Sequence, residues 1–103
     1  MNFTRIKVTA VRDTGVFVAR DNTSGYYVFS ALEPKPVSVG DILRIPDWKL
    51  GEDPLQTATW ESNGQSLAVS VECWGGARPV ALRMLEHIGN PNQARKARGG
   101  HGR

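Results

Sequence analysis

The chain has 103 residues, 40% hydrophobic and 22% charged, a length that suits one domain with a single core and a composition that excludes an intrinsically disordered chain. No apolar run approaches the roughly 20 residues of a membrane-spanning helix, so we expect no membrane partner. The first residues lack the pattern of a signal peptide, and one cysteine cannot form an internal disulfide. We therefore expect a cytoplasmic protein. Residues 89–103 contribute +4 to the formal net charge of +3, which leaves −1 for residues 1–88, so the net charge does not by itself indicate a basic nucleic-acid-binding domain.

The amino-terminal third of the chain predicts three short antiparallel strands. Apolar residues alternate with polar ones over residues 4–12, which is the pattern of a strand with one buried face. Turn-forming residues at 13–15 and 21–25 bound a second strand, and residues 25–30 form a third that is rich in aromatic and β-branched side chains. We interpret residues 4–30 as a three-stranded meander.

A connector, a fourth strand and a loop follow the meander. Pro34 and Pro36 exclude a regular helix and a central strand from residues 31–39, so this stretch should cross one end of the sheet. Residues 41–45 resume an apolar strand, which a proline then ends. Residues 47–54 show no hydrophobic period and should form an exposed loop.

The clearest local signal predicts a hairpin of two further strands. Asn63 and Gly64 stand between the alternating runs 55–61 and 66–73, and an Asn-Gly pair in that setting favours a tight hairpin turn. Residues 74–78 contain two adjacent glycines and should break the sheet after the hairpin.

One helix is expected near the carboxyl end. Pro79 suits a first helical position, apolar residues then recur at helical spacing, and Gly89 suits a left-handed cap. This helix should lie across the sheet or fill an open end of a barrel. Residues 90–103 have no large apolar side chain, so we expect a disordered basic tail after a single small β-barrel domain of residues 1–89.

This order of elements predicts an all-β fold, a small and partly open antiparallel barrel of the oligonucleotide-binding type with one short carboxyl-terminal helix. Three segments also resemble cold-shock domains and related RNA-binding barrels: 13–18, 26–32 and 39–43. Those families carry a Gly-aromatic motif on the second strand, which Phe17 and the nearby glycine match in part. Tyr26 and Phe29 match the aromatic motif of the third strand, with Val28 where the family has histidine. The resemblance covers residues 4–45 and implies a barrel that binds nucleic acid.

The amino-terminal strands also carry a combination of side chains that suits single-stranded RNA or DNA. Cations neutralise phosphates and exposed aromatic rings stack on bases. If Val16 and Val18 point into the barrel, Phe17 lies on the outer face beside the cations of the first strand. We therefore expect a non-enzymatic nucleic-acid binder with these candidate contacts: Arg5, Lys7, Phe17, Tyr26, Phe29, Arg95, Lys96 and Arg98. The alternative is that the rings belong to the core and that the strand cations are a solvated face.

A second hypothesis is a protein-interaction module, such as an inhibitor or an accessory subunit. Aromatic residues beside loops are frequent in interfaces, and two tryptophans flank loops here. The candidate partner contacts are Asp47, Trp48, Glu52, Asp53 and Trp74. The two histidines, one cysteine and scattered carboxylates lack the spacing of a metal site or a nucleophile motif. We therefore expect no catalytic residue, no metal and no cofactor, and the oligomeric state stays open.

Overall fold

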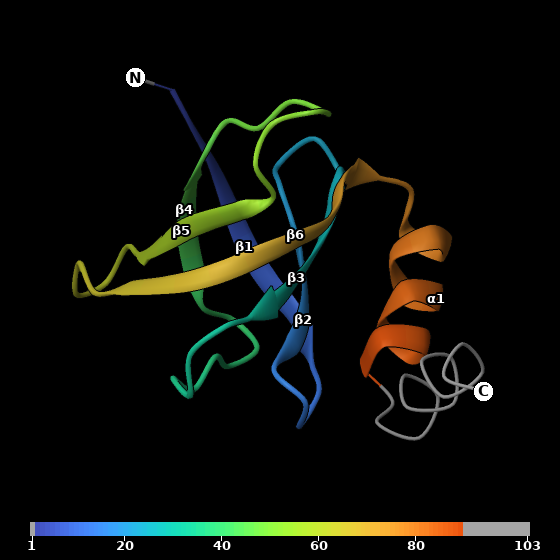
Figure 1. Cartoon of the computed structure of the whole chain (residues 1–103), viewed down its shortest axis with the longest axis horizontal. Helices are drawn as coiled ribbons and strands as arrows, with labels where there is room; N and C mark the ends of the chain where they lie inside the picture. Colours follow the sequence, from blue (N-terminus) through green and yellow to red (C-terminus); the bar gives the residue numbers. More distant parts are fainter. Residues whose placement is uncertain (1, 90–103) are drawn as a thin grey trace.

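Six strands and one helix form the part of the chain that the computed structural model describes, residues 2–89. The elements are β1 (Phe3–Val11), β2 (Val16–Arg20), β3 (Tyr26–Ala31), β4 (Ile42–Pro46), β5 (Leu55–Trp60), β6 (Ser66–Gly76) and α1 (Arg78–Gly89). The strands close into an antiparallel barrel in the order β1-β2-β3-β6-β5-β4, so two meanders meet at the β1–β4 and β3–β6 ladders (Figure 1). The predicted antiparallel barrel with one short carboxyl-terminal helix is confirmed. The barrel is closed, whereas the sequence predicted a partly open one. The predicted tail, residues 90–103, lies outside the described residues.

Large apolar side chains from all six strands fill the barrel interior. Phe17 and Phe29 stand directly opposite one another in the β2–β3 ladder and are fully buried, with ring centroids 5.4 Å apart. The other strands contribute Ile6, Val8, Leu43, Ile45, Ala58, Trp60, Leu67, Val69 and Val71. Removal of this apolar surface from water is the main favourable contribution to folding.

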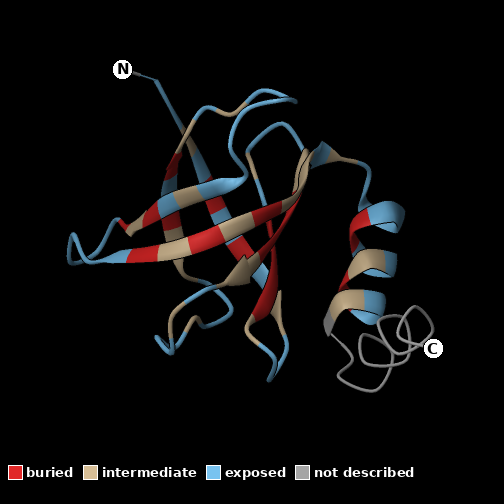
Figure 2. Cartoon of the chain, in the orientation of Figure 1, coloured by how far each residue is buried: buried red, intermediate tan, exposed pale blue. Residues whose placement is uncertain are grey.

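A second apolar cluster lies between the outer face of the barrel and α1. Val16, Val18 and Val28 of β2 and β3 pack against Ala81 and Leu85 of the helix. Figure 2 shows the buried residues of α1 on the side that faces the barrel and the exposed ones on the opposite side. The helix lies across the sheet, which is one of the two placements that the sequence predicted. As a result, β2 and β3 are buried on both faces.

The predicted orientation of β2 is wrong. The ring of Phe17 is inside the barrel, whereas Val16 and Val18 lie beneath α1. A strand that is buried on both faces has no polar side, so a period of two cannot show which face is the interior. Close packing gives a physical reason for the observed choice, because the phenyl ring fills the volume of the barrel and the smaller valines fit against a helix.

β1 changes face at a β-bulge around Thr9. Val8 pairs with Ala19, but Ala10 pairs with Val18, so Thr9 is an extra residue in β1. Val8 faces the interior, and after the bulge Ala10 packs against the cluster beneath α1. The alternation predicted for this strand therefore holds only as far as the bulge.

β6 is longer than predicted. The sequence indicated a break in the sheet after the hairpin, but β6 continues to Gly76, which lies opposite Tyr26. Register shifts in the β3–β6 ladder and a φ of +69° at Gly75 allow this end of the strand to bend. Trp74 thereby belongs to the sheet, and its ring packs edge-on against Tyr27 with centroids 4.9 Å apart.

Candidate nucleic-acid interface

Four basic side chains come together on the outer face of β1, β2 and β4. Lys7 lies directly opposite Arg20 in the β1–β2 ladder, and Arg5 lies directly opposite Arg44 in the β1–β4 ladder. All four residues are exposed. Directly opposed residues of an antiparallel pair project to the same face, and like charges in such pairs are destabilising. We call these four residues the cationic row.

One carboxylate compensates half of the cationic row. The Arg5 Nε atom donates to Glu61 Oε2 at 2.6 Å, and an Arg44 terminal nitrogen lies 3.6 Å from Glu61 Oε1. The hydrogen bond from Arg5, opposed by slight desolvation and aided by both positive charges, lowers the pKa of Glu61. Among residues 2–89, Lys7 and Arg20 form no ion pair with an acid. Two opposed cations at this face therefore remain uncompensated.

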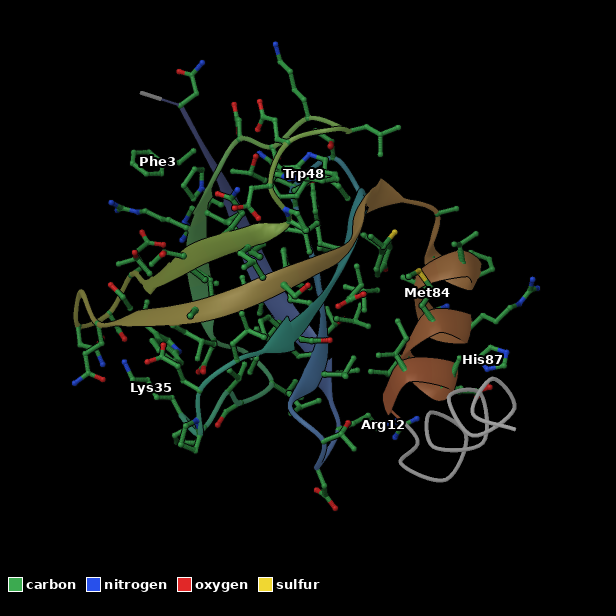
Figure 3. The ribbon with its side chains drawn as sticks, viewed as in Figure 1. Phe3, Arg12, Lys35, Trp48, Met84 and His87 are labelled. Atoms are coloured by element: carbon green, nitrogen blue, oxygen red, sulfur yellow. The ribbon has the colours of Figure 1, made fainter. Side chains whose placement is uncertain are left out.

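A surface pocket of about 580 Å³ lies beside these two cations. Its walls are the first half of β1, the end of β2, the β2–β3 turn, Tyr27 and Ile42. Phe3 lines the pocket, is 55% exposed, and projects from the amino-terminal end of β1 (Figure 3). The volume is in the range of pockets that hold small ligands, and the lining combines cations, hydroxyl groups and one exposed ring.

The structure brings together only some of the predicted nucleic-acid contacts. Arg5 and Lys7 are exposed on the same face, as the first hypothesis requires. Phe17 and Phe29 are 0% exposed, so the prediction that they contact bases is wrong; both rings fill the barrel interior. Tyr26 is half-buried against the cluster beneath α1, directly opposite Arg20. The basic residues of the tail lie outside the described residues: Arg95, Lys96 and Arg98.

Three members of this face were missed by the sequence analysis: Phe3, Arg20 and Arg44. Arg20 continues the outer set of β2 that begins with Val16 and Val18, so the opposite choice of face would have identified it. Phe3 precedes the predicted first strand by one residue, yet it pairs with Pro46 in β4. Nothing in the local sequence showed that Arg44 would lie opposite Arg5, because the register between β1 and β4 depends on barrel closure.

The predicted partner contacts gather at one end of the barrel. Trp48 and Trp74 are half-buried with ring centroids 6.0 Å apart, and the Trp48 indole N–H donates to the carbonyl oxygen of Asp53 at 3.1 Å. Figure 3 shows Trp48 in the loop between β4 and β5 at that end. The two rings therefore hold residues 47–54 against the barrel.

The acids of the same loop have local hydrogen-bond partners. The Asp47 carboxylate accepts the Thr4 hydroxyl at 2.7 Å, and the Asp53 carboxylate accepts the backbone N–H of Leu55 at 2.9 Å. Glu52 accepts the backbone N–H of Lys49 at 3.4 Å. These contacts order the loop, and all three acidic residues remain exposed.

Asp21 anchors the β2–β3 turn at the rim of the pocket. Its carboxylate accepts the backbone N–H groups of Thr23 and Gly25 at 2.8 and 2.9 Å, the Thr23 hydroxyl at 2.7 Å, and the Tyr27 hydroxyl. Desolvation opposes ionisation, but these hydrogen bonds outweigh it and lower the pKa of Asp21 to about 2. Burial, together with the bond to Asp21, raises the pKa of Tyr27 well above its ordinary value.

Replacing Asp21 with asparagine should lower the melting temperature by roughly 4–8 °C, the shift that about 1 kcal/mol produces in a domain of this size. Because the folded-state pKa of Asp21 lies below its ordinary value, its carboxylate stabilises the fold above about pH 4, and this contribution is lost as the pH falls towards 2. Melting temperatures measured by circular dichroism from pH 7 to pH 2 should therefore converge for the two proteins. A difference that stayed constant over this range would contradict the assigned role.

The part of the chain from Asn2 to Gly89 contains no cluster of three or more histidine, cysteine, aspartate or glutamate side chains that could hold a metal ion. It also contains no helix that is long and apolar enough to cross a membrane. Comparison with protein-family models, curated proteins and solved structures found no match to this chain. The candidate interface therefore rests on the chain's own geometry.

Proposed function

We propose that this protein binds single-stranded RNA or DNA through the cationic row, without catalysing a reaction. The observation that carries the proposal is the pair of directly opposed cations, Lys7 and Arg20, which are exposed and have no acidic partner among the described residues. Such a pair costs folding free energy, and a phosphate placed between the two charges would remove that cost.

Exposed Phe3 is the aromatic group of this surface. A flat ring beside cations is the arrangement that accepts an unpaired base over its face while the phosphates meet the charges. A duplex keeps its bases stacked inside, so it would use the charges alone and leave the ring without a partner. The proposed site should therefore bind single strands in preference to duplexes.

The resemblance of residues 4–45 to cold-shock domains supports the proposal through the order of strands alone. The ring positions that the resemblance suggested are not available, since Phe17 and Phe29 lie in the core. Base contacts would instead come from Phe3 at one end of the cationic row and, to a smaller extent, from half-buried Tyr26. The single cysteine, which cannot form an internal disulfide, is in keeping with the cytoplasmic location that we propose for this protein.

Replacing both Lys7 and Arg20 with alanine should weaken binding to a labelled oligouridine or oligothymidine, because two phosphate contacts are lost. The plot of the logarithm of the association constant against the logarithm of the salt concentration should become shallower by about 0.7 for each lost contact. Fluorescence anisotropy across a salt series measures both quantities. Arg83→Ala, which removes an exposed cation from α1, is the matched control and should leave the slope unchanged.

A second control separates the barrel face from the basic tail. A variant with Arg95, Lys96 and Arg98 replaced by alanine should keep the part of the salt slope that depends on Lys7 and Arg20. If the double variant bound with the affinity and slope of the wild type, while the tail variant lost all binding, the cationic row would not be the site.

A further inference from the structure

The first half of β1 has a neighbouring strand on one side only. The ladder with β4 covers Phe3 to Lys7, whereas the ladder with β2 begins at the pair Lys7–Arg20 and continues towards Val11. β2 ends at Arg20, where the chain turns away into residues 21–25. Residues 3–6 therefore form a free strand edge within a barrel whose ladders otherwise close.

The hydrogen-bond pattern shows which backbone groups face this edge. Val8 donates its N–H to Asp41 at 2.9 Å and accepts the N–H of Gly40 at 2.8 Å, so its backbone groups point towards β4. The carbonyl oxygen of Asn2 likewise accepts the N–H of Asp47 at 3.2 Å, so it also points towards the β4 side. Backbone direction alternates along a strand, so the N–H and C=O groups of Phe3 and Arg5 point the other way, towards the missing part of β2.

These backbone groups open onto the pocket of about 580 Å³. Within the described residues, no backbone hydrogen bond joins Phe3 or Arg5 to the β2–β3 turn across that pocket. An edge of alternating donors and acceptors is what another extended chain needs in order to pair with a sheet. The pocket supplies the space in the plane of the sheet that such a chain would occupy.

We propose that the free edge of β1 accepts an extended acidic peptide segment of a partner protein as an added strand. A peptide offers donors and acceptors at the alternating strand spacing that the backbone of Phe3 and Arg5 requires, which a sugar-phosphate chain does not. The acidic character follows from Lys7 and Arg20, the uncompensated cations at the inner end of the edge. This inference goes beyond the proposed nucleic-acid binding: both use the charges of Lys7 and Arg20, but only the added strand also uses the backbone edge of β1.

A second copy of this chain is a poorer occupant for the same edge. Antiparallel pairing of two β1 edges would bring Arg5 and Lys7 of one copy against the same residues of the other. Like charges that face each other across a strand pair are destabilising, and charged edges are a common protection against such self-association. An acidic segment reverses the sign of this interaction and favours pairing.

Arg5→Ala and Arg5→Pro form a matched pair that tests the backbone contact. Both variants remove the guanidinium group and its bond to Glu61, but only proline also removes the N–H that faces the pocket. Proline is tolerated on an edge strand when its nitrogen faces away from the ladder. The probe is a fluorescein-labelled six-residue peptide with glutamate at alternate positions, and the readout is anisotropy with the full chain.

Arg5→Ala should weaken binding of this peptide a few-fold through the lost charge, and Arg5→Pro should weaken it at least a further tenfold. A peptide methylated on alternate backbone nitrogens should not bind, nor should its lysine counterpart. Equal affinity of the two Arg5 variants would overturn the proposal, as would equal binding of the methylated peptide or absence of binding by the acidic peptide.

Two further measurements keep the test decisive. If Arg5→Pro does not fold, hydrogen exchange of the Arg5 amide in the wild-type chain replaces it: the acidic peptide should slow this exchange, and unchanged exchange would overturn the proposal. Oligouridine binding should be equal in Arg5→Ala and Arg5→Pro, because the phosphate contacts use side chains. Failure of peptide pairing is thus distinguishable from failure of nucleic-acid binding.

Discussion

Replacing Phe17 with alanine should reduce the free energy of unfolding by about 3–5 kcal/mol, the usual cost of removing a buried phenyl ring. The ring is 0% exposed and lies 5.4 Å from that of Phe29, its direct partner in the β2–β3 ladder. Because the interior is closely packed, the neighbouring strands cannot collapse into the space that remains. Urea denaturation followed by circular dichroism measures the loss, which is a large part of the stability of a domain of this size.

Phe3→Ala is the control that separates core from surface. Phe3 is 55% exposed, so its truncation should change the free energy of unfolding by about 0.5 kcal/mol or less. The same truncation should weaken oligouridine binding by about 1–3 kcal/mol, the contribution of one stacked base. The opposite result, a stable Phe17→Ala protein that no longer binds oligouridine, would place Phe17 on the surface and contradict the fold described above.

Replacing Leu85 with alanine should reduce the free energy of unfolding by about 2–5 kcal/mol. Leu85 is 3% exposed and, with Ala81, covers the outward valines of β2 and β3. The truncation opens a cavity between α1 and the barrel and uncovers the apolar outer face of those strands. Thermal and urea denaturation of the full chain, monitored by far-ultraviolet circular dichroism, give the magnitude.

Leu82→Ala provides the matched control on the same helix. It is 36% exposed and faces away from the cluster, so the identical chemical change should cost less than about 1 kcal/mol. Comparable losses for Leu82→Ala and Leu85→Ala would mean that α1 contributes through its own helicity rather than through docking on the barrel.

The sequence predicted the elements of this fold better than it predicted their faces. The strand segments, the Asn-Gly turn and the helix that begins near Pro79 all have local signals, and these elements are present. Phe17 illustrates the limit, because every residue from Val16 to Ala19 is buried and the choice of face depends on where α1 docks. That information is tertiary and does not exist within the strand.

The candidate site was predictable only in part for a related reason. Arg5 and Lys7 follow from the polar side of one amphipathic strand. Arg20 and Arg44 join them through ladders with residues far away in the sequence, whose register is fixed by barrel closure. The bulge at Thr9 also shifts the register between β1 and β2, and no residue pattern in β1 predicts it. A site assembled across three strands therefore becomes visible only after the strands are paired.

The two ladders that join the meanders also have a consequence for the kinetics of folding. β1 pairs with β4, and β3 pairs with β6, so both ladders join segments that are far apart in the sequence. In the second of them, residues 26–31 pair with residues 69–76. Loop-closure entropy opposes such distant contacts until late, so the local hairpins should form first and closure of the cylinder should limit the rate. During synthesis, the first meander would leave the ribosome with both outer strands unpaired, and it would need protection from aggregation until the second meander emerged.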